Sequence, residues 1–275
     1  MKPPVFDYAV AEHIDEVIKL LSEEGDDAQL LAGGQSLIAM LNMRLVRPAL
    51  VLDISRLPDE NFIRLQDDFV EIGCTVTQSD LQSWSDLGTS LPLLARALPW
   101  VGHQQTRNKG TICGSVAHAD PSAELPLCFA ALGGEALLYS SQGERVLKAD
   151  EFQVGMLETA CAPDEMIRML RFPKAEIGSG YGFGEVGYRH GDFAIVAIAV
   201  VANSNGVRIA VGGATEKPEV HEWPLMEGKV LDDALNDLAR NLNAVEDHHA
   251  TARYRRSLIC ALGRRVVEDA LLCRG

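Results

Sequence analysis

Two adjacent glycines near the start of the chain, Gly33 and Gly34, stand between a strand-like run and a helix-like segment. The apolar run covers residues 30–32, the helix-like segment covers 37–46, and a second strand-like run follows at 50–54. A strand, a glycine turn, a helix and another strand make the order of a βαβ unit. The sequence therefore predicts a small βαβ unit whose first turn contains both glycines.

The same turn has the chemistry of an anion site. Glycines let the backbone approach a ligand closely, and successive N–H groups at a helix N-terminus attract negative charge. A diphosphate would fit the turn that runs from Ala32 to Leu37. An ordinary tight turn in which Ser36 caps the helix explains the same residues equally well.

A second segment, residues 111–124, repeats the small-residue pattern farther along the chain. Its carboxylates, Asp120 and Glu124, could accept hydrogen bonds from ribose hydroxyls or from an adenine amine. The alternative is a helix start capped by Asp120 or Ser122, which is compatible with ligand binding. His118 within this segment either lines a ligand or makes a structural hydrogen bond.

The balance of charges argues against several kinds of partner. Lys and Arg number 25 against 39 Asp and Glu, a formal net charge of −14, which opposes attraction to nucleic-acid phosphates.

The longest apolar run, 194–202, is too short to span a bilayer, which takes roughly 20 residues. The first residues contain no secretion-like apolar segment, so a cytoplasmic location is expected.

The six cysteines are scattered, without a C-x-x-C pair or the close run that holds an iron–sulfur cluster. They are expected to be reduced thiols, mostly buried. No His/Cys spacing suits a metal, no P-loop motif occurs, and no acid, base or nucleophile forms a recognisable catalytic constellation. From its own residues the chain is expected to bind a phosphorylated ligand and to supply no catalytic residue.

Apolar periodicity and turn residues predict the remaining elements. The expected helices are 12–25, 77–87, 92–98, 125–132, 231–242 and 250–272. The expected strands are 62–65, 70–73, 135–139, 145–148, 165–172, 194–202 and 207–211, with a polar loop at 103–109. The last two strands are joined by residues 203–206, and the Asn-Gly pair there is a strong hairpin signal.

Glycines concentrate between 174 and 184, which predicts a domain boundary or a mobile connection, with a second domain starting near residue 176. Residues 182–187 match G-x-G-x-x-G, but no helix follows them, so the match is interpreted as accidental. Five arginines gather in the last predicted helix: Arg253, Arg255, Arg256, Arg264 and Arg265. They indicate a solvated helix face, with a docking surface for an acidic partner as the alternative.

The two small-residue segments begin about 75 residues apart, and in this order they resemble the FAD-binding medium subunit of the molybdenum hydroxylases, the carbon monoxide dehydrogenase and xanthine dehydrogenase superfamily. Residues 31–37 resemble the family's first flavin diphosphate loop, and 111–124 resemble its second. The flanking segments 107–110 and 189–194 also match. The resemblance covers essentially the whole chain.

The resemblance also implies which residues contact the cofactor. Those expected to hold the diphosphate through their backbone are Leu31, Ala32, Gly33, Gly34, Gln35, Ser36, Leu37, Gly114 and Ser115. Those expected at the ribityl, ribose or diphosphate region are Thr111, Asp120 and Glu124, and those expected nearest the isoalloxazine are Val101, Leu170 and Phe193. Relatives often have tyrosine where Phe193 aligns. They usually have glycine at Cys113, where an ordinary backbone with an inward thiol is expected.

The implied fold class is α+β. An FAD-binding domain, 1–175, would consist of two subdomains, roughly 1–57 and 58–175, with FAD between them. A small antiparallel sheet with helices, 176–275, would follow.

The implied function is that of a cytoplasmic oxidoreductase subunit with FAD, no catalytic residue and no metal of its own. Its partners would be a small subunit with [2Fe-2S] clusters and a large subunit with a molybdenum-pterin cofactor, in a hetero-oligomer such as a dimer of heterotrimers. The chain would take electrons from the clusters and pass them to an external acceptor. Two alternatives stay open: a self-sufficient FAD-dependent oxidoreductase, and a binding subunit that has lost FAD.

Overall fold

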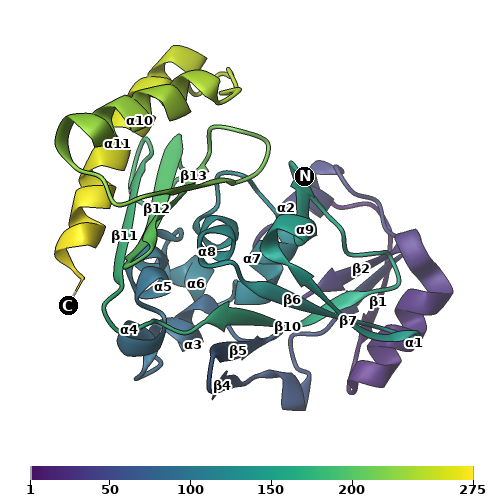
Figure 1. Cartoon of the computed structure of the whole chain (residues 1–275). Coiled ribbons are helices and arrows are strands. Elements are labelled where there is room, and N and C mark those ends of the chain that lie inside the picture. The colour runs from purple at the N-terminus through teal and green to yellow at the C-terminus, as the bar shows by residue number, and fades with distance from the viewer. Residues whose placement is uncertain (1, 275) are drawn as a thin grey trace.

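The computed structural model describes residues 2–274 and shows an α+β protein with a three-stranded, a five-stranded and a four-stranded sheet and a two-stranded hairpin. In Figure 1 the chain passes from the purple N-terminal sheet through the teal middle region to the green and yellow C-terminal sheet and helices. Within the described residues, no helix is both long and apolar enough to cross a membrane.

The N-terminal sheet is parallel and has the strand order β1-β3-β2. Its elements are β1 (Asp7–Val10), α1 (Ile14–Glu24), β2 (Ala28–Leu31), α2 (Leu37–Met43) and β3 (Leu50–Asp53). Strands β2 and β3 pair in parallel on either side of α2 in the chain, which confirms the predicted βαβ unit. Helix α1 buries the apolar positions that predicted it, Val17, Ile18 and Leu21.

The five-stranded sheet is antiparallel and has the order β4-β5-β10-β6-β7. Its strands are β4 (Ile63–Leu65), β5 (Phe69–Gly73), β6 (Glu135–Ser140), β7 (Gly143–Lys148) and β10 (Met166–Pro173). Helices follow β5 in the chain: α3 (Gln78–Gln82), α4 (Leu87–Ser90), α5 (Pro92–Ala97), α6 (Gln104–Arg107), α7 (Ile112–His118) and α8 (Glu124–Leu132). Three buried aromatic rings, those of Phe129, Phe152 and Phe172, meet edge to face in this core.

Two predictions in this helical region are wrong. The helix expected over 77–87 ends at Gln82, because Thr77 and Asp80 form a capping box that starts a short helix and α4 begins separately. The expected polar loop at 103–109 contains α6. The guanidinium of Arg107, at the end of that helix, donates hydrogen bonds to the carbonyls of Val101 and Gly102, which holds the helical turn in place.

The remaining short elements connect the larger ones. They are the 3-10 turns η1 (Gly25–Asp27), η2 (Pro58–Glu60) and η3 (Leu98–Trp100), the helix α9 (Ala149–Phe152) and the hairpin β8 (Gln153–Gly155) and β9 (Glu158–Thr159). One hydrophobic cluster contains Val17, Phe129 and Ala199, and a second cluster lies between the C-terminal sheet and its two helices. The domain borders expected at 57/58 and 175/176 stay a prediction.

The C-terminal sheet is antiparallel with the order β11-β12-β13-β14. Its elements are β11 (Gly180–Val186), β12 (Val196–Asn203), β13 (Gly206–Gly212), β14 (Glu219–Trp223), α10 (Gly228–Asn241) and α11 (Ala252–Leu272). Helix α11 packs on one face of β11 and β12 (Figure 1), and α8 packs on the opposite face of β12 and β13.

Alternate glycines of β11 allow α11 to approach closely. A Cβ at Gly180 would collide with the carbonyl oxygen of Ala270, and a Cβ at Gly182 would collide with that of Val266. The segment expected as a mobile connection is therefore a packed strand from residue 180. The G-x-G-x-x-G match lies in this strand and serves helix–sheet packing.

The predicted hairpin between β12 and β13 is present, although its turn differs from the expected one. Asn203 pairs with Gly206, so Ser204 and Asn205 form the turn and the Asn-Gly pair does not occupy its two central positions. Of the six thiols, those of Cys74, Cys113 and Cys128 are buried and the others are partly or fully exposed. The expectation of buried cysteines is thus only half met.

The arginines of α11 do not share one environment. Arg255 is 3 % exposed, and its guanidinium donates to the carbonyls of Ile195 and Gly213 and pairs with Asp247. Arg264 pairs with acidic side chains on α10 and α11. The predicted solvated face is therefore wrong for Arg255, which ties the helix to the sheet.

Candidate functional site

One cleft of about 760 Å³ gathers segments from all three parts of the chain. Its walls come from the β2–α2 turn, from the first residues of α7 and α8, from the region around β9 and β10, and from residues 191–193. Both small-residue segments singled out in the sequence face this cleft.

Most of the predicted cofactor residues line the cleft. These are Ala32, Gly33, Gly34, Gln35, Ser36, Leu37, Val101, Thr111, Gly114, Ser115, Asp120, Glu124 and Phe193. Leu31 does not line it, because this residue is the end of β2 and its carbonyl accepts the amide of Ile54. Leu170 does not line it either, because its side chain is fully buried between β5 and β6, and Met166 and Ile167 are the β10 residues that reach the cleft.

The first loop presents a run of free backbone donors. Within residues 2–274, no amide from Gly33 to Leu37 donates a hydrogen bond to the protein, and the first bonded amide is that of Ile38. Gly34 has φ 69°, and a Cβ at Gly33 would collide with the carbonyl oxygen of Lys109. Ser36 stands at the N-cap position of α2, as the alternative interpretation expected, but its side chain makes no capping hydrogen bond.

The second segment is a helix followed by a turn. Thr111 caps α7, because its Oγ1 accepts the amide of Gly114 at 2.9 Å. Asp120 Oδ1 accepts the amide of Ser122 at 2.8 Å in the turn before α8, so neither of them is a helix cap. Cys113 lies inside α7 with its thiol toward the carbonyls of β5, which confirms the expected ordinary backbone.

Burial perturbs two ionisable groups in the cleft. Glu124, the first residue of α8, is 6 % exposed, and burial together with the nearby Asp120 charge raises its pKa to about 7. Burial lowers the pKa of His118, although the Asp120 charge opposes that change. Glu124 can therefore change charge near neutral pH, whereas the lowered pKa of His118 favours its neutral form.

The rim near Val101 is held by contacts that the sequence motifs did not reveal. The ring of His190 stacks on that of Trp100 with centroids 5.3 Å apart, and Gly191 leaves no room for a Cβ beside His103. Phe193, in the same loop, is 65 % exposed at the cleft. The loop 187–193 therefore rests on the turn that carries Val101.

Sequence reasoning missed several lining residues. They include Asp26, Thr106, Leu157, Cys161, Glu165, Met166, Ile167 and Asp192. They belong to different elements and follow no local pattern, so only the fold brings them together. Asp192 alone had a signal, because it lies in the segment 189–194 that resembles the family.

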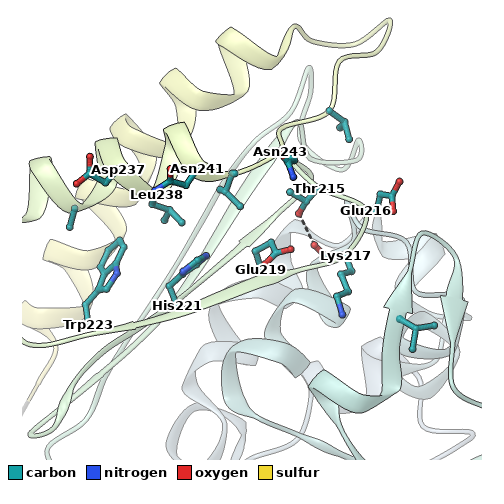
Figure 2. A pocket seen from close by; sticks show the side chains of 14 residues that line it. Thr215, Glu216, Lys217, Glu219, His221, Trp223, Asp237, Leu238, Asn241 and Asn243 are labelled. Carbon is teal, nitrogen blue, oxygen red and sulfur yellow. Dashed lines mark hydrogen bonds between the residues drawn. The ribbon is translucent and has the colours of Figure 1, made fainter.

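A second concavity, of about 790 Å³, lies on the C-terminal sheet and contains none of the predicted residues. Figure 2 shows Glu219, His221 and Trp223 of β14 facing Asp237 and Asn241 of α10. The loop from β13 to β14 closes one end, where the hydroxyl of Thr215 donates to the carbonyl of Lys217.

Comparison with known proteins places the chain in a family. Residues 4–175 match the family model described as the FAD binding domain in molybdopterin dehydrogenase. The chain is 37% identical over 98% of its length to the alpha subunit of the 6-hydroxypseudooxynicotine dehydrogenase complex of Paenarthrobacter nicotinovorans, covering 96% of that protein. It is 34% identical to the medium subunit of nicotine 6-hydroxylase of the same organism, over 98% of this chain and 99% of the relative.

A solved structure agrees with this placement. A chain of the carbon monoxide dehydrogenase of Hydrogenophaga pseudoflava superposes with a TM-score of 0.95 at 28% identity, covering 100% of both chains. The structural match therefore includes the C-terminal sheet as well as the matched family region. The chain belongs to the FAD-binding medium subunits of the molybdenum hydroxylases, a family of oxidoreductase subunits.

Proposed function

We propose that the chain is the electron-transferring flavoprotein subunit of a molybdenum hydroxylase, receiving electrons from [2Fe-2S] clusters of a small partner subunit and delivering them to an external acceptor. The large partner would hold the molybdenum-pterin cofactor and select the substrate. The relatives support this assembly, because one is named as part of a dehydrogenase complex and another as a medium subunit. The cytoplasm is the proposed location.

The free amides from Gly33 to Leu37 carry the proposal. Unpaired backbone N–H groups are costly unless water or a ligand accepts their hydrogen bonds, and a consecutive run of them forms an anion-binding concavity. A diphosphate supplies the acceptor oxygens that such a run needs. The close contact of Gly33 with Lys109 fixes the turn in the donating conformation.

The other cleft residues divide into groups. Ala32, Gly114 and Ser115 would complete the backbone cradle, and Thr111, Asp120 and Glu124 would receive the hydroxyl-bearing part of the cofactor. Val101 and Phe193 would lie nearest the isoalloxazine. Bound FAD supplies the redox chemistry, since it can take up two electrons one at a time. The chain's own residues bind it, orient it and limit the access of water.

The first test is the cofactor itself. The purified chain should be yellow and release FAD on acid or heat denaturation, because the cleft offers a diphosphate cradle and no covalent attachment is expected. FMN, or a flavin still attached after denaturation, would contradict this assignment.

The second test separates a relay from a self-sufficient enzyme. Co-expression with the proteins encoded beside it should yield a complex with FAD, iron, acid-labile sulfide and molybdenum. Nicotine, caffeine and carbon monoxide are suitable first probes, and the compound that bleaches the flavin of the complex anaerobically should not bleach the isolated chain. Reduction of the isolated chain at a comparable rate would replace the relay by the self-sufficient oxidoreductase.

A further inference from the structure

Gln78 is a buried glutamine in the wall of the cleft that none of the sequence patterns singled out. It is the first residue of α3 and lines the cleft, although it is only 4 % exposed. Its Oε1 is buried without a hydrogen-bond partner among residues 2–274. A buried amide oxygen without a partner is costly and calls for an explanation.

Gln78 lies where the two small-residue segments meet. Its backbone amide donates a hydrogen bond of 2.8 Å to the carbonyl of Gly110, and the preceding Thr77 forms an antiparallel bridge with Thr111. Its side-chain amide lies against Gly110, because a Cβ there would come within 3.1 Å of both Nε2 and Oε1. A Cβ at Gly33 would lie 2.7 Å from the Cα of Gly110, so the first loop contacts the same glycine. The amide of Gln78 is thereby fixed close to the run of free backbone donors.

The burial of Oε1 leaves Nε2 as the polar atom of Gln78 that can reach the cleft. The two ends of a glutamine amide have nearly the same shape, but one accepts hydrogen bonds and the other donates them. The observed orientation turns the donor toward the cleft and leaves the acceptor in the wall without a partner. Proteins keep such a local cost mainly where the residue serves a ligand.

The charges of the cleft favour an uncharged donor for a diphosphate. Among the described residues that line the cleft, none is a lysine or an arginine, and five are acidic: Asp26, Asp120, Glu124, Glu165 and Asp192. The negative charge of a diphosphate must therefore be met by uncharged N–H and O–H groups. The side-chain amide of Gln35 is already used, because its Nε2 donates to the carbonyl of Gly33.

We propose that Gln78 is a further cofactor-binding residue, whose Nε2 donates a hydrogen bond to a phosphate oxygen of the FAD diphosphate beside the amides of residues 33–37. The proposal rests on the proposed function and adds to it a side chain of α3, outside both segments that resemble the family's diphosphate loops. Gln78 binds a part of the cofactor that does not react, so it governs the affinity for FAD and not the redox chemistry.

The test compares FAD affinity with the stability of the FAD-free chain. Gln78→Met keeps the length of the side chain and removes both polar atoms of the amide. It should bind FAD about tenfold more weakly, or worse, because a hydrogen bond to a charged group is lost. Without FAD it should be at least as stable as the wild type, because the unpartnered oxygen is gone. Flavin fluorescence of the full chain after removal of its FAD measures affinity, and urea unfolding measures stability.

Gln153 offers a matched control. It is 3 % exposed, lies outside the cleft lining, and its Nε2 donates a hydrogen bond of 3.3 Å to the carbonyl of Pro126. Because this buried amide has a protein partner, Gln153→Met should lower the stability of the FAD-free chain and leave the FAD affinity of the folded chain unchanged. The two variants should therefore show opposite effects.

ADP identifies the part of the cofactor that Gln78 contacts, because it carries the diphosphate without the ribityl chain or the flavin ring. Competition against FAD should show that Gln78→Met weakens ADP binding by the same factor as FAD binding. An unchanged ADP affinity beside a weakened FAD affinity would overturn the contact with the diphosphate. Should Gln78→Met fail to fold, Gln78→Leu provides a second apolar side chain of similar volume.

The proposal is also overturned if Gln78→Met keeps the FAD affinity of the wild type. It is overturned as well if the weaker binding comes with an equal loss of stability in the FAD-free chain, because the amide would then have a structural role. A wild-type chain that binds no FAD would instead refute the proposed function. The two failures are thus distinguishable.

Discussion

The amide of Leu157 donates a hydrogen bond of 3.1 Å to the carbonyl of Ala119 at the edge of the cleft, and both residues have left-handed backbones. Their φ angles are 56° and 50°. Only one other non-glycine residue in 2–274, Arg44, has a positive φ. Left-handed residues other than glycine cost roughly 1 kcal/mol or more each, so strain is concentrated beside the proposed cofactor site.

Leu157→Gly should stabilise the chain by up to about 1 kcal/mol, because glycine removes the strain of the left-handed backbone. Leu157 is 49% exposed, so little apolar burial is lost. Urea unfolding measures the change. Leu225→Gly is the control, since Leu225 is similarly exposed and has no positive φ. It should be neutral or destabilising, and an equal gain in both variants would rule out strain as the cause.

Gly34→Val should lower the FAD content of correctly folded chain by tenfold or more. A valine there would need φ near 69° and would press on Ile38 and Leu31, which displaces the free amides. Flavin absorbance per folded protein is the measurement. Gly88→Ala is a suitable control, because no atom lies within 4 Å of a Cβ at that position.

Gly182→Val should behave differently from both Gly34→Val and Gly88→Ala. Its side chain would collide with Val266 of α11, so the free energy of unfolding should fall while the FAD affinity of the remaining folded chain stays near that of the wild type. A specific loss of FAD at this site, with stability unchanged, would contradict the separation of the two glycine motifs.

The parts of the fold that sequence could predict are those whose signals are local. The βαβ unit followed from apolar periodicity and the glycine turn, which lie within one short stretch. The sequence predicted Thr111 as a cofactor contact but not as the N-cap of α7, because the capping residue depends on where that helix begins. The sequence predicted that the backbone of residues 33–37 would hold a diphosphate. It also placed Leu170 at the cleft, where the structure does not have it, because the strand register decides which side chains of β10 reach the cleft.

Residues whose role depends on distant packing could not be found in this way. Arg255 looked like one more arginine on a solvated face, and only the docking of α11 on the sheet shows it bonded to two carbonyls. Glu185 stood in a glycine-rich stretch, and its burial depends on its place on the face of β11 opposite α11.

Arg255→Met should lower the free energy of unfolding by about 2–4 kcal/mol, because it leaves the buried carbonyls of Ile195 and Gly213 without donors. Chemical denaturation measures the loss. Arg253→Met, at an exposed position of the same helix, should change stability by less than about 0.5 kcal/mol. Equal losses of unfolding free energy in the two variants would contradict the buried role of Arg255 and favour the solvated helix face that the sequence suggested.

The stability of the chain should fall as pH rises from about 5 to 8, in part because of Glu185. Burial raises its pKa in the folded chain to about 8, against an ordinary value of 4.5 for a glutamate. The folded state therefore holds a proton that the unfolded state has released in this interval, and stability is lost as pH rises until the folded group also ionises. Glu185→Gln has no such proton. The difference in unfolding free energy between variant and wild type should grow across this interval, with a slope of at most about 1.4 kcal/mol per pH unit, and level off above pH 8.

Glu124 contributes in the same direction, since burial also raises its pKa in the folded chain, to about 7. The Glu124→Gln difference should therefore also grow as pH rises above 5. Urea unfolding of the three proteins at half-unit steps of pH measures both curves. A Glu185→Gln difference independent of pH would mean that the carboxyl is ionised throughout, because only a proton retained by the folded state produces the slope.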